Sequence, residues 1–180
     1  LGIELPDDVR ETLLRRIIEL GDKKHTVVPE DLRFIIADVL KTPSEQLVRV
    51  SDYEVVVGNG RLPRATVTIA YRGREAEASA EGDGGYDAFM NATKKALRSF
   101  KITVPRLADF RVRIPPGGRT YALVETVISW SGTNPEEGNL VTQGVDSDQM
   151  AAAVIATEKM LNEIVAKRPR AASRRRSTKA

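Results

Sequence analysis

Cysteine is absent from the 180-residue sequence, and histidine occurs once. Without cysteine the chain has no disulfide, no thiolate nucleophile and no zinc site built on sulfur, which is consistent with a reducing cytoplasm. His25 alone cannot form a two-histidine metal site or a serine–histidine relay, and its polar surroundings favour an exposed loop. We therefore expect no metal and no cofactor in this chain.

Long apolar runs are also missing. No run approaches the ~18 apolar residues of a membrane-spanning helix, and no charged-then-apolar leader opens the sequence, so we expect a cytoplasmic protein with no membrane partner. Hydrophobic residues make up 41% of the chain, enough for the core of one domain or of one domain with a small helical appendage. Because Leu1 is not a methionine, we expect a chain that is processed or cut from a longer one.

Acidic residues are missing from the C-terminal residues 167–180, which carry seven basic ones. The remainder holds 21 basic and 25 acidic residues, so the net charge of +3 conceals a mildly acidic body. A basic tail can bind nucleic acid by releasing counterions, but no aromatic residue interleaves these arginines to stack on bases. The composition favours a disordered, solubilising tail, and nucleic acid is the less favoured partner.

The first 46 residues show helical periodicity in two stretches. One stretch follows Pro6-Asp7-Asp8 and ends at Gly21, and the other begins at Pro29 and is closed by Pro43. The apolar positions are Val9, Leu13, Leu14, Ile17, Ile18 and Leu20, then Leu32, Ile35, Ile36, Val39 and Leu40. A helical hairpin this small cannot stand alone, so we expect it to pack on the domain that follows.

From Leu47 the apolar period changes to two, which is typical of β-strands. Strands are predicted around residues 47–57, 65–71 and 74–80. The stretch GDGGYDAFMNATKKAL, residues 82–97, then predicts a glycine-rich turn followed by a helix. This unit has the order strand, strand, strand, helix.

The same order recurs in the second half. Strands are predicted at 110–114, 120–130 and 139–144 and a helix at 145–166, with turns or loops at 115–119 and 131–138. ATKKAL at 92–97 returns as ATEKML at 156–161, and Gly82 and Gly144 each end a predicted third strand. These similarities indicate an internal repeat.

The repeat predicts an α+β fold in which an N-terminal helical linker hairpin is followed by a duplicated βββα domain with pseudo-two-fold symmetry. The predicted boundaries are 1–46 for the linker subdomain, 47–166 for the duplicated domain with repeats at about 47–104 and 105–166, and 167–180 for the tail.

The turn at 82–85 is a poor phosphate cradle when taken alone. It lacks the Gly-Lys-Ser/Thr ending of a P-loop and the G-x-G-x-x-G spacing, and Asp83 and Asp87 place negative charge beside it. The simpler interpretation is a tight turn with an acidic N-cap. Carboxylates elsewhere are scattered, so the residues give no positive evidence of catalysis.

Taken together, these turns and repeats resemble the C-terminal regulatory region of the 2-isopropylmalate synthases and their citramalate synthase relatives. GDGGYDAF at 82–89 resembles that family's G-[ND]-G-P-[VI]-D-A motif, and TQGVDSDQMAAAVIA at 142–156 resembles its second, G-V-x-x-D-[IV]-[IV]-x-A-S. The helical opening resembles the linker subdomain that joins barrel to regulatory domain. The resemblance covers residues 1 to about 166.

The resemblance implies a feedback sensor. Such enzymes join acetyl-CoA to a 2-oxo acid in a metal-dependent (β/α)₈ barrel of ~250 residues, and the pathway's end product inhibits them from the regulatory dimer. The barrel's R-D-G-x-Q and H-x-H motifs have no counterpart here, so we expect no activity from this chain alone. The implied partners are a second copy of the chain, the barrel of the parent enzyme, and a branched-chain amino acid, with leucine preferred to isoleucine.

The resemblance also assigns an effector site to the two turns. A free amino acid needs N–H donors for its carboxylate, acceptors for its ammonium group and a small apolar pocket. N–H groups at the helix starts suit the carboxylate, the aspartates can accept from the ammonium, and small residues with Tyr86 can shape the pocket. The expected effector residues are Asp83, Gly84, Gly85, Tyr86, Asp87 and Ala88 in the first turn, and Gly144, Val145, Asp146, Asp148, Ala151 and Ala152 in the second.

Both motifs depart from the family pattern. Gly85 replaces a proline, Tyr86 replaces a branched residue, and Gln149, Met150 and Ala153 replace two branched residues and a serine. Two alternatives to a leucine sensor therefore stay open. One is a citramalate synthase-like region that binds isoleucine, and the other is a dimerisation scaffold without a ligand.

Overall fold

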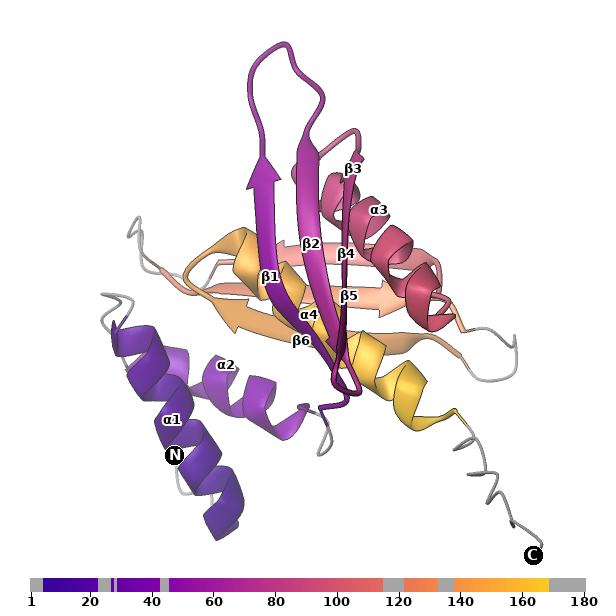
Figure 1. Cartoon of the computed structure of the whole chain (residues 1–180). Helices are drawn as coiled ribbons and strands as arrows, with labels where there is room; N and C mark the ends of the chain where they lie inside the picture. Colours follow the sequence, from indigo (N-terminus) through magenta and orange to yellow (C-terminus); the bar gives the residue numbers. More distant parts are fainter. Residues whose placement is uncertain are drawn as a thin grey trace, which may run out of the picture.

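The computed structural model describes residues 5–22, 27, 29–42, 46–114, 122–132 and 138–168. In chain order the elements are α1 (Asp7–Asp22), α2 (Pro29–Leu40), β1 (Val48–Val56), β2 (Arg64–Tyr71), β3 (Arg74–Glu81), α3 (Gly85–Leu97), the 3₁₀ turn η1 (Arg98–Phe100), β4 (Leu107–Arg113), β5 (Val124–Trp130), β6 (Leu140–Asp146) and α4 (Gln149–Ala166) (Figure 1). The loop around His25, the turn at 115–119, most of the loop at 131–138 and the tail beyond Arg168 lie outside the described residues. No described helix is both long and apolar enough to cross a bilayer.

Within the described residues, six strands form two three-stranded antiparallel sheets with the orders β1-β2-β3 and β4-β5-β6. One helix follows each sheet, so the predicted α+β class and the twice-repeated order strand, strand, strand, helix are confirmed. α3 packs on β2 and β3, whereas α4 packs on β5 and β6 and also contacts β1. α4 therefore lies against both sheets.

Alternation along β2 explains why one face of the first sheet accepts α3. The buried residues Ala65, Val67 and Ile69 pair across the ladder with Ala80, Ala78 and Ala76 of β3. Alanine side chains are small enough for a helix to approach the sheet closely. The predicted alternation of residues 65–71 and 74–80 is confirmed by this face.

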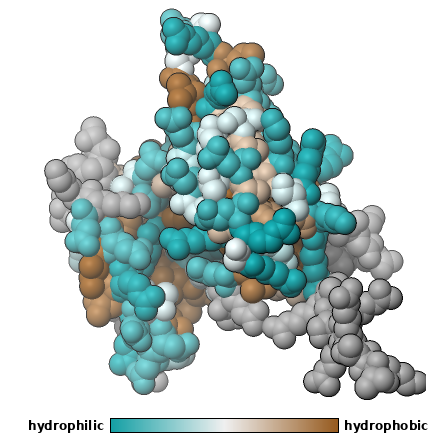
Figure 2. All heavy atoms as spheres, viewed as in Figure 1, coloured by the Kyte–Doolittle hydropathy of each residue, from teal (hydrophilic) through white to brown (hydrophobic). Residues whose placement is uncertain are grey.

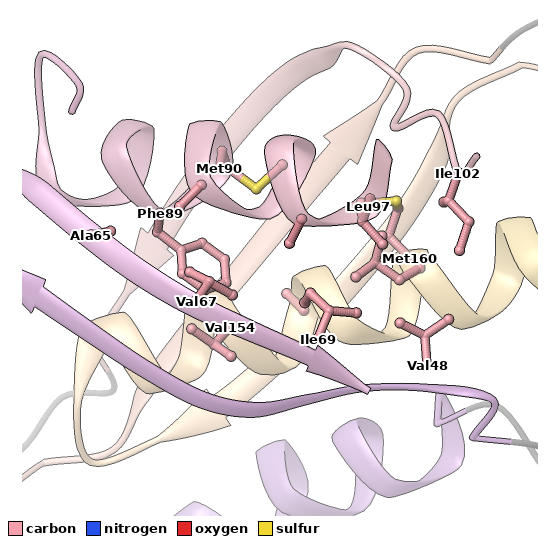
Figure 3. Packing of buried hydrophobic residues seen from close by; sticks show 14 of the residues in the cluster. Val48, Ala65, Val67, Ile69, Phe89, Met90, Leu97, Ile102, Val154 and Met160 are labelled. Carbon is pink, nitrogen blue, oxygen red and sulfur yellow. The ribbon is translucent and has the colours of Figure 1, made fainter. Parts of the chain in front are cut away.

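Both repeats contribute to one hydrophobic core. Phe89 of α3 lies in the same cluster as Val154 and Met160 of α4 (Figure 3). Trp130 of β5 is fully buried in this cluster, and its indole N–H donates to Thr142 Oγ1 over 2.9 Å. The prediction that Trp130 is a core residue is therefore confirmed.

Side chains of α4 close the free edge of β1. Asn162 Oδ1 accepts from the N–H groups of Leu47 (2.6 Å) and Val48 (2.9 Å), and its Nδ2 donates to the Val48 carbonyl (2.8 Å). Glu158 Oε2 accepts from the Val50 N–H over 2.8 Å, and burial raises the pKa of this carboxyl. An edge strand of the first repeat thus has backbone groups satisfied by a helix of the second.

The helical hairpin packs on the second repeat, as its small size required. Leu20 of α1 and Phe34 and Ile35 of α2 form a second buried cluster with Leu123 and Val145. Val145 belongs to β6, so this cluster joins the hairpin to the second sheet. α2 contacts β6 directly.

Part of the hairpin's apolar surface stays exposed. Leu14 and Ile18 of α1 are 59% and 53% exposed, and Leu40 of α2 is 56% exposed. Figure 2 shows apolar surface on this pair of helices. The predicted apolar stripe of α1 is therefore buried on one side only, the side that carries Leu20.

Polar contacts also tie α2 to the second repeat. Lys159 Nζ donates to Asp38 Oδ1 (2.8 Å) and to the Asp38 carbonyl (2.6 Å), and Lys41 Nζ donates to Gln143 Oε1 (2.9 Å). Burial raises the pKa of Asp38 and lowers that of Lys159, and the attraction between the two charges opposes both shifts. The contact is a buried ion pair between two helices that are distant in sequence.

Several boundaries in the second repeat differ from the prediction. β4, predicted at 110–114, spans Leu107–Arg113. β6 continues to Asp146, so the expectation that this strand ends at Gly144 is wrong, and α4 begins at Gln149 instead of Val145. The additional strand residues pair with β5, an interaction that local periodicity does not reveal. β5 begins at Val124, later than the predicted residue 120.

Candidate functional site

The first turn joins β3 to α3. Gly84 is the N-cap residue of α3 and has an extended backbone (φ −143°, ψ 167°). Asp87 Oδ2 accepts from the Asp83 N–H (3.1 Å) and from Asn91 Nδ2 (3.2 Å), and Asn91 also donates to the Glu81 carbonyl (3.1 Å). Asp87 is exposed at the start of the helix, with one carboxylate oxygen engaged inside the turn. An aspartate thus closes this turn without being its N-cap.

Close approaches explain two glycines of the first turn. A Cβ atom on Gly82 would collide with the backbone nitrogen of Ala88, which is itself fully buried. A Cβ atom on Gly85 would lie 3.2 Å from the side chains of both Val55 and Val57. These two valines leave little space for the proline that the family motif has at this position. The start of α3 therefore packs against the end of β1.

Tyr86 points into the core. Its ring centroid lies 4.8 Å from that of Phe110 and 6.0 Å from that of Phe89, and its hydroxyl is 2.8 Å from Thr157 Oγ1. Because the Thr157 hydroxyl donates to the Ala153 carbonyl (2.8 Å), the Tyr86 phenol is the donor to Thr157. Burial raises the pKa of this phenol. Tyr86 thus joins the first turn to α4 and β4.

The second turn joins β6 to α4 and is capped by an aspartate. Asp148 is the N-cap residue, and its Oδ1 accepts from the Ala151 N–H over 2.8 Å. The Asp148 N–H donates to Asp146 Oδ1 (3.2 Å), and Ser147 Oγ approaches the same oxygen (3.3 Å). Asp148 is exposed, whereas Asp146 is 1% exposed. The two aspartates therefore differ in their access to solvent.

α1 reaches Asp146 through Arg16. Arg16 Nη2 donates to the Val145 carbonyl (2.6 Å) and to Asp146 Oδ2 (3.3 Å), while Nη1 pairs with Glu19 Oε2 (3.1 Å). The Arg16 side chain is 16% exposed. One oxygen of the buried Asp146 carboxylate thus faces α1, and the other faces the second turn.

Small residues bring α4 against β6. A Cβ atom on Gly144 would collide with the Ala152 carbonyl and lie 2.8 Å from the Ala156 nitrogen. Ala152 is fully buried and Ala151 is half-buried. Of the small residues predicted to shape a pocket at this turn, Ala151 is the one that reaches the surface.

The two turns are connected through intervening residues. Tyr53 of β1 packs edge-on against Phe89 at a centroid distance of 5.9 Å. Burial raises the pKa of Tyr53, and the charges of Asp148 and Asp146 raise it further, so the second turn lies within electrostatic reach of β1. In the described part of the chain, no hydrogen bond or ion pair joins one turn directly to the other.

A surface hollow of about 320 Å³ lies between α1, α2 and α4. Its charged wall residues are Arg15, Arg16, Glu19, Asp38, Glu158 and Lys159. No predicted effector residue lines this hollow. Among the described residues, no group of three or more histidine, aspartate or glutamate side chains is placed to hold a metal ion.

A comparison with known families identifies the fold that carries these turns. Residues 26–165 match the model of the LeuA allosteric (dimerisation) domain. The chain belongs to this family. Both βββα repeats and both turns lie within the matched LeuA domain, so the resemblance on which the site was predicted is confirmed.

Relatives of the LeuA domain chain include two kinds of synthase. A putative (R)-citramalate synthase of Methanopyrus kandleri is 30% identical over 85% of this chain and 29% of its own length. A 2-isopropylmalate synthase of Aquifex aeolicus is 29% identical over 93% of this chain and 31% of its length, and a probable one of Methanopyrus kandleri is 33% identical over 93% and 33%. The chain spans about a third of the length of these relatives.

Sequence reasoning missed several side chains that shape the second turn and its surroundings. They are Arg16, Asp38, Tyr53 and Lys159. One signal was available: Arg16 lies one turn from Leu13 and Leu20 on the apolar side of α1, where an unpaired charge would be costly. The identity of its partner could not be read from the sequence, because Asp146 lies 130 residues away.

Proposed function

We propose that this LeuA domain is the regulatory region of a 2-isopropylmalate synthase-like enzyme, where it binds leucine for feedback inhibition and holds two copies of the chain together. The observation that carries the proposal is the pair of βα turns, each of which presents an exposed aspartate, Asp87 or Asp148, at the start of a helix. The expected effector residues of both turns belong to this proposal.

The chemistry of the turns suits a zwitterion. The first N–H groups of a helix have no intrahelical acceptor, and with the helix dipole they favour a carboxylate. Asp87 and Asp148 are exposed and can accept from an ammonium group, whereas Asp146 already holds Arg16. Half-buried Ala151 offers apolar surface beside Asp148. The second turn is therefore the better supported of the two.

The proposed organisation follows the predicted boundaries. Residues 1–46 form the linker subdomain, 47–166 the effector-binding domain, and 167–180 a basic tail. We expect the repeats at about 47–104 and 105–166 to be related by pseudo-two-fold symmetry, which is consistent with their equal element order.

The parent enzyme would supply the catalytic function. By family resemblance it is a cytoplasmic acyltransferase whose barrel binds a divalent metal and condenses acetyl-CoA with a 2-oxo acid in branched-chain amino-acid biosynthesis. Effector binding at the dimer would shift the barrel between conformations to the extent that the two conformations differ in effector affinity.

Thermal unfolding of this chain with leucine, isoleucine, valine or glycine tests the proposal. A ligand at about 100 times its Kd stabilises by about 2.7 kcal/mol, which raises the Tm of a domain of this size by about 5–11 °C. We expect leucine to raise the Tm and glycine to leave it unchanged. A shift with isoleucine alone would favour the citramalate synthase-like alternative.

An Asp148→Asn variant sharpens this test. Asparagine is as good an N-cap as aspartate, so the variant keeps the helix start while removing the charge that would meet the ammonium. We expect the leucine-dependent shift to disappear in Asp148→Asn and to persist in Asp52→Asn, whose side chain is exposed on β1. A full shift in Asp148→Asn would exclude Asp148 as the ammonium acceptor.

A dimerisation scaffold without a ligand is the second candidate. It is favoured by the engagement of Asp87, Asp146 and Asp148 in bonds within their own turns and by Tyr86, whose ring fills space beside the first turn. A dimer in solution whose Tm responds to none of the amino acids would select this candidate.

A further inference from the structure

We infer that Arg16 is a positioning residue, through which the linker helix α1 sets the conformation of the second turn and senses its occupancy. The sensing part of this inference rests on the proposed function, whereas the positioning part does not.

The Asp146 carboxylate has different partners on its two oxygens. Oδ2 receives Arg16 Nη2 at 3.3 Å, and Oδ1 receives the Asp148 N–H at 3.2 Å and lies 3.3 Å from Ser147 Oγ. A second bond from Arg16 to the Val145 carbonyl (2.6 Å) fixes the guanidinium on the strand that leads into the turn. A displacement of Arg16 therefore changes the position of the carboxylate that holds the turn.

The second turn also fixes the start of α4. Asp148, whose N–H is bound by Asp146, accepts the Ala151 N–H over 2.8 Å as the N-cap. The chain of contacts from Arg16 to Asp146, Asp148 and Ala151 is continuous, and its first two members are largely buried. Charge-assisted hydrogen bonds of this kind are stronger than neutral ones, especially where water is excluded.

Among the described residues, the first turn has no equivalent contact with the hairpin. When the repeats are aligned on the N-caps Gly84 and Asp148, Gly82 takes the place of Asp146 and offers no carboxylate. The hairpin's other polar ties, Lys41 to Gln143 and Asp38 to Lys159, also end in the second repeat. In the part of the chain that the structure describes, the coupling between the linker and the effector site therefore runs through the second turn.

An amino acid at the second turn would disturb this arrangement directly. Its ammonium group would compete for Asp148, or its carboxylate would lie near the charge of Asp146, and each change reaches Arg16 through the shared carboxylate. A ligand shifts an equilibrium only by its difference in affinity for two states, and the docked and released positions of α1 provide two such states.

Amide hydrogen exchange on the whole chain without any ligand tests the positioning role. In Arg16→Met we expect the amides of residues 147–152 to exchange about tenfold faster, because a hydrogen bond to a charged group is lost. Arg16→Lys, which keeps a charge near Asp146, should recover part of the protection. Arg15→Met is the matched control, since Arg15 is exposed and its ion pair among the described residues is a 3.9 Å contact with Glu11.

A substitution of the other partner distinguishes loss of the Arg16–Asp146 contact from unfolding of α1. Asp146→Asn leaves the sequence of α1 unchanged, and we expect faster exchange in α1 and at the start of α4 while the amides of α3 keep their protection. Unchanged exchange at 147–152 in Arg16→Met, or an equal change in Arg15→Met, would overturn the inference.

The sensing role is tested by adding leucine or isoleucine to the wild-type chain. We expect the ligand to change exchange in α1, and this change to be lost in Arg16→Met although calorimetry still detects binding. Binding without any response in wild-type α1 would overturn the sensing part. If neither amino acid binds the wild-type chain, the proposed function fails, and the ligand-free experiment still decides whether Arg16 positions the turn.

Discussion

Tyr86 links the first turn to the second repeat through one hydroxyl group and one ring. The phenol donates to Thr157 of α4, and the ring packs on Phe110 of β4. Both contacts cross from one βββα unit to the other. A residue predicted to shape a ligand pocket therefore also holds the two units together.

Tyr86→Phe should reveal a pH-dependent contribution to stability. Tyrosine in the unfolded chain ionises near pH 10, and burial raises the pKa of Tyr86 in the folded chain. Its contribution is therefore fully present below about pH 10 and is lost as the pH rises further. We expect Tyr86→Phe to lower the free energy of unfolding by about 1 kcal/mol at about pH 8. The gap to wild type should shrink by about pH 11.

Urea unfolding of the two proteins at both pH values measures this gap. Tyr71→Phe is a suitable control, because the Tyr71 hydroxyl donates no hydrogen bond among the described residues and its ring packs on Phe100. A gap that stays constant with pH would show that the Tyr86 phenol is not protected from ionisation.

At the scale of elements, α4 contacts β1 through hydrogen bonds between a side chain and the backbone. Asn162 is 1% exposed and is bound to three backbone groups at the β1 edge, the N–H groups of Leu47 and Val48 and the carbonyl of Val48. Its Nδ2 also donates to the Glu158 carbonyl within α4 (2.9 Å). Buried backbone groups that lose their partners cost about 1–3 kcal/mol each. The side chain of a helix here takes the place of a neighbouring strand.

Asn162→Ala should destabilise the protein by about 3 kcal/mol or more, because three backbone groups lose their partner. Guanidinium unfolding measures the loss, and amide exchange in β1 locates it. Asn59→Ala, in the exposed turn between β1 and β2, should change stability by less than about 0.5 kcal/mol. A loss at Asn162 no larger than at Asn59 would mean that water replaces the amide without cost.

The element order followed from periodicity alone, because β2 and α4 carry strong local patterns. Ala65, Val67 and Ile69 alternate with polar residues, and ATEKML repeats ATKKAL one unit later. These patterns are set by burial against a neighbouring layer, so they can be recognised in the sequence without knowing which element that neighbour is. The two motifs could also be recognised from the sequence, because the residues of each motif are contiguous.

The end of β6 and the role of Gly144 could not be predicted in this way. Aligning the repeats on Gly82 and Gly144 places both at a strand end, but the two glycines avoid different collisions, one with the start of α3 and the other with Ala152 inside α4. Pairing of Val145 with β5 is a long-range interaction, as is the contact of Arg16 with Asp146. Such contacts depend on tertiary structure.

At the scale of the whole molecule, the Asp38–Lys159 ion pair anchors the helical hairpin to the duplicated domain. Removing one member of a buried ion pair leaves an unpaired charge and costs about 3–5 kcal/mol, whereas replacing both with apolar residues is often nearly neutral. We therefore expect Asp38→Leu and Lys159→Met to release α1 and α2 from the domain. The double variant should retain more docking than the sum of the single effects predicts.

Amide exchange in α1 and α2, compared with that in α3, measures this release. The single variants should expose the hairpin amides while leaving α3 protected, because no described polar contact joins the hairpin to the first repeat. Additive effects of the two substitutions would contradict the presence of a coupled pair.

The hydrogen bonds between Asn162 and the edge of β1 restrict how recombination can divide such a domain. A gene fragment encoding residues 47–104 would produce a sheet whose β1 edge lacks the partner that α4 provides, and a core without Val154 and Met160. An uncovered strand edge favours pairing with other chains, and hence aggregation. Although the two halves are similar in sequence, we expect recombination to transfer them between proteins as a pair, because the β1 edge of the first half has its backbone groups satisfied by α4 of the second.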